Sequence, residues 1–140
     1  MRLVLDNSVV MRWLFRDGTP EALAYADRIL DVLTQEDAQA LVPGIWGLEV
    51  GNVIVRAEAK GWLQEARSAE FLGILNDMAI ETDARSTAQA LGDTLQLARR
   101  YTLSTYDAAY LELALREGLP LATNDEALST ALRVAGGRLA

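Results

Sequence analysis

The stretch Leu3-Val4-Leu5-Asp6-Asn7-Ser8 decides the fold. Its first three residues form a short apolar run, and its last three are residue types that often cap the start of a helix. A buried strand that passes directly into a helix explains both halves. We therefore expect a strand over residues 3–5 and a helix over residues 9–15.

Short apolar runs and helical patterns alternate along the rest of the chain. Further strands are expected at residues 40–42, 79–81 and 119–123. Helices are expected at residues 20–35, 43–59, 65–78, 86–100, 104–115 and 124–135, before a last short segment at 138–140. Strands that alternate with helices predict an α/β fold, in which helices cover both faces of a parallel sheet.

Length and composition indicate one domain over residues 1–140, since 51% of the residues are hydrophobic and no linker or repeat is present. No apolar stretch reaches the roughly 18 to 20 residues that a membrane helix needs. The amino-terminal apolar run meets Asp6 after five residues, unlike the core of a signal peptide. We expect a cytoplasmic protein that makes no contact with membranes.

The chain has no cysteine and no histidine, which excludes thiolate and imidazole chemistry. Any catalysis has to use carboxylate, amide and hydroxyl groups, and these oxygen ligands favour hard cations such as Mg²⁺ or Mn²⁺. The formal charge of −7 argues against a broad basic surface for nucleic acid.

Two acidic residues, Asp6 and Asp125, each follow the end of an expected strand. Ligands of open α/β sheets bind outside the carboxyl ends of the strands, so both acids stand where a site would form. Each could instead be a helix cap or a first-turn acid that the helix dipole favours.

Asp107 falls in the middle of an apolar helical stripe that includes Tyr110, whereas Glu112 and Arg116 take the outward positions. The other interpretation of Asp107 is the acidic member of a capping box that starts at Ser104.

Glu49 lies at the edge of the apolar stripe of the helix expected over residues 43–59, beside Val53. It could simply be a solvated residue at the side of that helix. Unpaired carboxylates directed at a core are costly, so acids on the core side of two helices need a common partner. Four converging acids could hold one or two divalent ions, and such ions promote in-line displacement at a phosphate. The pattern therefore predicts a metal-dependent phosphodiesterase.

Four segments resemble the PIN-domain ribonucleases, and more narrowly the VapC-like toxins of bacterial toxin–antitoxin pairs. These segments are residues 4–8, 43–52, 104–111 and 121–125. They are distributed along the chain, so the resemblance covers nearly all of it. The resemblance implies a three-layer α/β/α sandwich with a short, mainly parallel central sheet. It also implies Mg²⁺- or Mn²⁺-dependent cleavage of RNA, a homodimer, and inhibition by a small antitoxin protein.

The resemblance also assigns residues. Asp6, Glu49, Asp107 and Asp125 match the acidic quartet of the family, which would bind metal and carry catalysis. Ser8, Ser104, Thr123 and Asn124 match supporting positions, although the three hydroxyls could equally be helix caps. Arg12 and Arg16 are candidates to meet RNA phosphate or an antitoxin acid, or else belong to a solvated helix face.

Other families fit less well. A receiver domain needs paired acids after the first strand and a late lysine, but the only lysine is Lys60. A haloacid-dehalogenase-type phosphatase needs an aspartate where Ser8 stands, and no glycine-rich phosphate loop is present.

The serious alternative is a PIN-like protein with little catalytic activity that acts mainly as a protein-binding module. Four large aromatic residues could supply its partner surface, although such residues more often lie in the core: Trp13, Phe15, Trp46 and Trp62.

Overall fold

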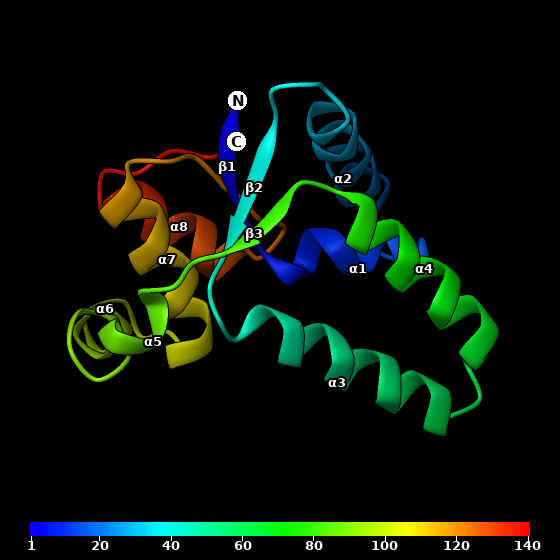
Figure 1. The fold of residues 1–140 in the computed structure, drawn as a ribbon. Helices are drawn as coiled ribbons and strands as arrows, with labels where there is room; N and C mark the ends of the chain where they lie inside the picture. Colours follow the sequence, from blue (N-terminus) through cyan, green and yellow to red (C-terminus); the bar gives the residue numbers. More distant parts are fainter.

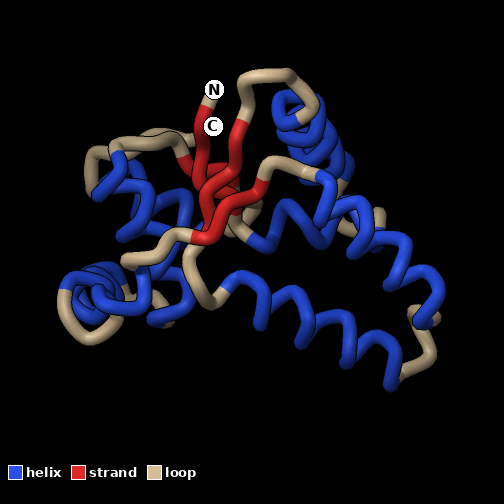
Figure 2. Tube along the Cα trace, in the orientation of Figure 1, coloured by secondary structure: helices blue, strands red, loops and turns tan.

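Four short parallel strands form the centre of the molecule, in the order β3-β2-β1-β4 (Figures 1 and 2). The computed structural model describes all residues from 1 to 140. The strands are β1 (Arg2–Leu5), β2 (Gln39–Val42), β3 (Ile80–Thr82) and β4 (Leu121–Ala122). The helices are α1 (Asn7–Phe15), α2 (Pro20–Leu33), α3 (Trp46–Ala59), α4 (Glu65–Asp77), α5 (Ser86–Gln89), α6 (Asp93–Tyr101), α7 (Thr105–Glu117) and α8 (Glu126–Val134).

Both faces of the sheet are covered by helices. Leu3 and Leu5 of β1 belong to a core that includes residues of α1, α2, α3 and α4. Val4, which lies between them, belongs to a second core with residues of α7 and α8. Successive strand residues point to opposite faces, so this division confirms the predicted three-layer α/β/α sandwich with its parallel sheet.

The expected elements are present, with one clear error. The single helix predicted over 86–100 is two helices, α5 and α6, because the chain leaves helical geometry at Gly92 (φ −107°, ψ −109°). The strand predicted over 119–123 is also shorter than expected, since β4 contains only Leu121 and Ala122. None of the helices combines the length and the apolar composition that are needed to cross a membrane.

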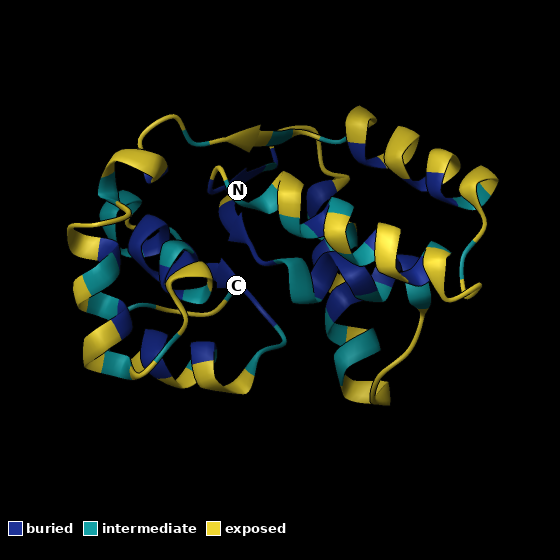
Figure 3. Ribbon diagram, turned by 90° about the horizontal axis from the view of Figure 1, so that it is seen from below, coloured by how far each residue is buried: buried dark blue, intermediate teal, exposed yellow.

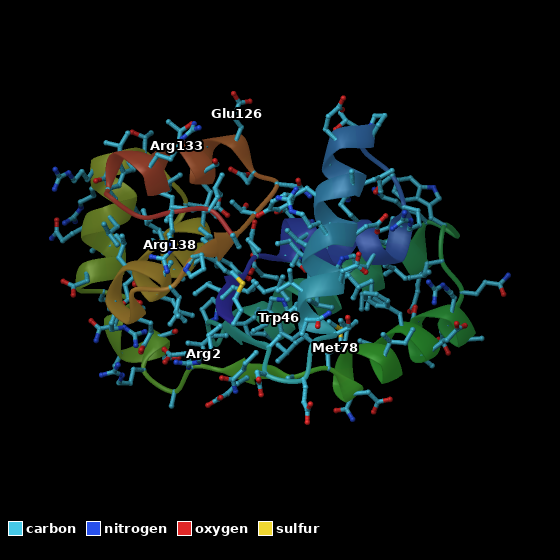
Figure 4. All side chains as sticks on the ribbon, turned by 90° about the horizontal axis from the view of Figure 1, so that it is seen from above. Arg2, Trp46, Met78, Glu126, Arg133 and Arg138 are labelled. Atoms are coloured by element: carbon cyan, nitrogen blue, oxygen red, sulfur yellow. The ribbon has the colours of Figure 1, made fainter.

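Helices α3 and α4 form an antiparallel pair that extends from the body of the molecule, here called the α3–α4 arm (Figure 1). In Figure 3 the arm lies on the right, and its helices are exposed on one face and buried on the other. A groove of about 480 Å³ runs along the arm, and its lining is mainly apolar. Trp46 and Met78, both labelled in Figure 4, line this groove where the arm meets the sheet.

The large aromatic residues divide between core and surface. Trp13 is buried and its Nε1 donates a hydrogen bond to the carbonyl oxygen of Ala26 at 2.8 Å. Phe15 and Trp46 are partly buried against the same core. Trp62, which follows α3, is largely exposed, and the ammonium group of Lys60 lies over its ring, 4.5 Å from the ring centre.

The prediction that Glu112 and Arg116 point outward from α7 is wrong. Glu112 is only 3% exposed, and its carboxylate accepts a 2.6 Å hydrogen bond from Arg116 Nε. Arg116 Nη2 also donates to Asp83 at 2.7 Å, in the loop between β3 and α5. Helix α6 packs along α7 and, together with this loop, covers the face that the sequence pattern assigned to solvent. The guanidinium group compensates both acids.

Asp83 gives this network a dependence on pH. Burial by itself raises the pKa of Asp83, but hydrogen bonds from Arg116 and Ser86 bring that pKa below its ordinary value. A lowered pKa stabilises the fold above the unfolded-state value of about 3.9, and this contribution disappears as the pH falls through the folded-state pKa. We expect Asp83→Asn to lower the free energy of unfolding by about 1.5–3 kcal/mol at pH 7.

Urea unfolding of both proteins at pH 7 and at pH 3 tests this prediction. The difference between wild type and Asp83→Asn should shrink at pH 3, which lies below the unfolded-state pKa of about 3.9, so that part of the contribution is already lost. An equal difference at the two pH values would contradict the ionic origin of the effect.

Candidate active site

Asp6 lies at the carboxyl end of β1, next to the end of β4. Leu5 pairs in register with Ala122, so the residues that follow, Asp6 and Thr123, leave the sheet side by side. The Asp6 side chain is buried, with the residue 5% exposed, and its Oδ2 accepts hydrogen bonds from Ser8 Oγ at 2.6 Å and Thr123 Oγ1 at 2.7 Å. Asp6 occupies the N-cap position of α1 but makes no capping hydrogen bond with its side chain. The carboxylate therefore belongs to the sheet edge rather than to the helix start.

The same two hydroxyls hold the segment that leads into α8. Ser8 Oγ accepts a hydrogen bond from the Asn124 backbone N–H at 2.9 Å, and Thr123 Oγ1 accepts one from the Asp125 N–H at 3.0 Å. Asp125 itself caps α8, because its Oδ1 accepts from the Leu128 N–H at 2.8 Å. The capping interpretation of Asp125 is thus correct for one carboxylate oxygen, and the other has no side-chain partner.

Glu49 and Asp107 approach the same edge from α3 and α7. The Tyr110 hydroxyl, which is buried in α7, donates a 2.5 Å hydrogen bond to Glu49 Oε1. Asp107 lies about one turn before Tyr110 and so shares its face of the helix. Ser104 Oγ caps α7 by accepting from the Asp107 N–H at 3.1 Å, but the return bond from the Ser104 N–H to the Asp107 carboxylate is not made. The capping box is half formed, and a hydrogen bond with the Ser104 side chain lowers the pKa of Asp107, although burial outweighs it.

The four acids affect one another electrostatically. Burial is the main cause that raises the pKa of Asp6, and the negative charge of Asp125 adds to it. The pKa of Glu49 is raised by burial and by the charges of Asp6 and Asp107. The pKa of Asp107 is raised by burial and by the charges of Asp125 and Asp6. Each of these three pKa values is thus affected by at least one other acid of the four, and none of the four pairs with an arginine.

The donor set suits a hard divalent cation in its chemistry. All available groups are oxygens, and Asp6, Glu49 and Asp125 each have one oxygen fixed by a hydrogen bond and a second without a side-chain partner. No group of three or more acidic side chains is placed so that it could hold a metal ion. The acids therefore share the edge of the sheet but do not converge to coordination distance.

Arg12 and Arg16 lie toward the end of α1 that is farther from Asp6. Arg12 Nη2 forms a 3.0 Å ion pair with Asp17, and Arg16 Nη1 forms one of 2.6 Å with Asp27. Contact of either arginine with RNA or with an antitoxin remains a prediction, and it would compete with these ion pairs.

Sequence reasoning missed Tyr110 as a functional candidate. Its position three residues after Asp107 was visible, but tyrosine in an apolar stripe is normally read as core. The signal that could have found it is the buried hydroxyl, which needs a hydrogen-bond partner on a facing element.

Comparison with known proteins supports the fold. PAE2754 from Pyrobaculum aerophilum has a similar crystal structure, with TM-score 0.67 and 20% identity over 94% of this chain and 79% of the other. A toxin–antitoxin complex from Klebsiella pneumoniae contains a chain with TM-score 0.59 and 20% identity, over 99% of this chain and 96% of the other. VapBC2 from Rickettsia felis, bound to a DNA fragment from its promoter, contains a chain with TM-score 0.64 and 14% identity, over 99% of this chain and 96% of the other.

No curated protein sequence matches the chain. The model of one protein family does match it, over residues 3–133, and this family is described as the PIN domain. The match includes all four acids and nearly the whole sandwich, so the chain is a member of the PIN domain family.

Proposed function

We propose that this protein is a metal-dependent endoribonuclease and the toxin of a type II toxin–antitoxin pair. PIN domains are nucleases, and the observation that carries the proposal is the Asp6 carboxylate. It is buried without a cationic partner, it is held by two hydroxyls from separate strand ends, and three other acids raise the local negative charge. Such an arrangement is costly unless a cation joins it.

The chain's own groups would orient the acids. Ser8 and Thr123 fix one oxygen of Asp6, Tyr110 fixes one oxygen of Glu49, and the start of α8 fixes one oxygen of Asp125. Asp6, Glu49, Asp107 and Asp125 would hold one or two Mg²⁺ or Mn²⁺ ions once rotation of their side chains brings the free oxygens to coordination distance. Such ions would supply activation of water and stabilisation of the leaving oxygen of a phosphodiester. Because the chain carries a formal charge of −7, we expect RNA binding to depend on this site and a few arginines, or on basic surface that a partner supplies.

The antitoxin partner has support from the α3–α4 arm. Two of the structurally similar proteins are named as a toxin–antitoxin complex and as VapBC2. In this chain the groove of the arm is apolar, and the Nε1 of Trp46 in its lining has no hydrogen-bond partner. An amphipathic segment of a small antitoxin would cover this apolar surface. A homodimer is a further expectation of the same proposal.

Cleavage of RNA by the purified protein tests the proposal. A panel of structured and single-stranded RNAs is incubated with Mn²⁺, beside Asp6→Asn and beside wild type with EDTA. Cleavage by wild type alone would support a metal nuclease with Asp6 in its site. Cleavage that continues in the variant or in EDTA would contradict the proposal.

A second candidate is a PIN protein that acts mainly as a binding module. The exposed apolar groove of the arm favours it, because a partner surface needs no turnover. This candidate predicts that the protein binds Mn²⁺ and a partner protein but cuts no RNA of the panel. The cleavage experiment therefore separates the two candidates.

Tyr110 gives a prediction about the support of the site. Tyr110→Phe removes the hydroxyl that holds Glu49 Oε1 and leaves the ring in its buried position. Loss of such a supporting hydrogen bond typically costs about 10- to 100-fold in metal affinity or activity, so we expect a decrease of that size in Mn²⁺-dependent cleavage. Tyr101→Phe, at the end of α6, is the control and should cleave as wild type does, because no hydrogen bond joins the Tyr101 hydroxyl to any of the four acids.

A further inference from the structure

A pocket of about 350 Å³ has no role in the site described so far. It is bounded by the loop after β2, by α5 and α6, and by the first turn of α7, and is here called the α5–α7 pocket. Its lining includes Pro43, Leu48, Thr87, Leu91, Thr94 and Tyr106. No charged side chain is among the residues that line it.

We propose that the α5–α7 pocket receives one unstacked nucleobase of a single-stranded RNA, next to the phosphate that is cut. This inference rests on the proposed nuclease function and names where the substrate's sequence would be read. A pocket of this volume lies at the lower end of the range for small-molecule sites, about 300–1,000 Å³, which suits one base rather than a stretch of duplex.

The position of the pocket follows from two pairs of neighbours. Leu48 precedes Glu49 and Tyr106 precedes Asp107, and both Leu48 and Tyr106 line the pocket. Adjacent helical residues differ by about 100° in direction and about 1.5 Å along the axis. The helices α3 and α7 thus direct the acid toward the candidate active site and its neighbour toward the pocket. A base in the pocket would have its own phosphate close to the acids.

The lining has the chemistry that reads a base. Tyr106 is 57% exposed, and its ring can stack on a base, which is how proteins commonly hold bases of single-stranded RNA. Thr94 is only 2% exposed, and its hydroxyl has no hydrogen-bond partner in the protein. A second hydroxyl, on Thr87, faces Gly44 in the same lining. It lies 3.3 Å from the position that a Cβ atom would take on that glycine. Threonine hydroxyls both donate and accept, so they can match the polar edge of a base.

Two other ligands fit less well. A phosphate group would find no cationic side chain in the lining. An aliphatic side chain from another protein molecule would pack against Leu48 and the exposed Leu91, but it would leave the Thr94 hydroxyl unpaired. A neutral, flat ring with polar edges satisfies both the apolar walls and the buried hydroxyl.

Nuclear magnetic resonance of the full-length, ¹⁵N-labelled protein tests the inference without any need for cleavage. Adenosine, guanosine, cytidine and uridine are added separately in the absence of divalent metal. We expect at least one nucleoside to shift the backbone amide signals of Leu48, Thr87 and Tyr106. Tyr106→Ala should weaken that binding by at least about 5-fold, because stacking is lost.

Thr94→Val keeps the shape of the side chain and removes its hydroxyl, so it should change the order of preference among the four nucleosides. Trp62→Ala removes an exposed aromatic ring at the far end of α3 and should bind as wild type does. The inference is overturned if no nucleoside shifts the pocket signals or if Tyr106→Ala binds normally. It is also overturned if Leu91→Asp converts a stable dimer into a monomer, since a second copy would then fill the pocket.

The two proposals can fail separately. Nucleoside binding without RNA cleavage would keep the pocket and overturn the nuclease. Cleavage of a randomised RNA with no base preference beside the cut, in wild type as in Tyr106→Ala, would keep the nuclease and overturn the pocket.

Discussion

Asp6→Asn is expected to reduce RNA cleavage by at least about 100-fold while the protein stays folded. The loss follows because a metal ion supplies several kcal/mol of transition-state stabilisation, and about 2.7 kcal/mol corresponds to 100-fold. An amide oxygen can still accept the hydrogen bonds from Ser8 and Thr123, so the local structure should persist. Cleavage rates with Mn²⁺ and circular dichroism measure the two effects.

Stability without metal should move in the opposite direction to activity. The Asp6 carboxylate is buried, and its charge is repelled by another acid. A neutral amide removes both the cost of desolvating the charge and this repulsion. We expect the melting temperature of Asp6→Asn to equal or exceed that of wild type in EDTA. Mn²⁺ should raise the melting temperature of wild type and have much less effect on the variant.

Asp107→Asn is the companion variant and should behave in the same way. Glu126→Gln is the matched control, because Glu126 is an exposed acid next to Asp125 whose side chain points away from the molecule (Figure 4). If both site variants cut RNA at the wild-type rate, the assignment of the four acids is wrong.

Arg116→Met is expected to destabilise the fold by about 3–5 kcal/mol. The substitution keeps an unbranched side chain but leaves Glu112, which is 3% exposed, and the nearby Asp83 without their cationic partner. Removal of one member of a buried ion pair typically costs this much, because the remaining charge is uncompensated. Against a total stability of about 5–15 kcal/mol the loss is severe, and urea unfolding at pH 7 measures it.

Two further variants identify the cause. Arg67→Met removes an exposed arginine whose ion pair with Glu70 is 3.5 Å long, and it should change stability by less than about 1 kcal/mol. Glu112→Gln combined with Arg116→Met should be more stable than Arg116→Met alone, since the buried charge is gone. A double variant that is less stable than the single one would show that packing, not charge, dominates at α7.

The strands and most helices could be predicted because their signals are local. The apolar run before Asp6 and the residues that cap or end helices are read over a few neighbouring residues. The break at Gly92 was missed because the flanking segments have compatible helical patterns and a single glycine does not always end a helix. The burial of Glu112 was missed for a different reason, because it depends on the packing of α6 against α7, which is tertiary structure that the pattern of α7 does not contain.

The candidate site could likewise be predicted only in part. The positions of the acids relative to strand ends and apolar stripes indicated one edge of the sheet, and their mutual electrostatic effects agree with that placement. The hydrogen bonds from Thr123 to Asp6 and from Tyr110 to Glu49 were not predictable, because each joins residues on separate elements. Which side chains meet across such distances depends on the packing of the whole sheet.

The pairing of β1 with β4 also determines when the site can exist during synthesis. Asp6 leaves the ribosome well before its partner Thr123, which lies 117 residues later. While that part of the chain is still inside the exit tunnel, β1 has no β4 beside it and the carboxylate has only the Ser8 hydroxyl. A nascent chain would thus be unable to assemble the site next to the messenger RNA and the ribosome that produce it.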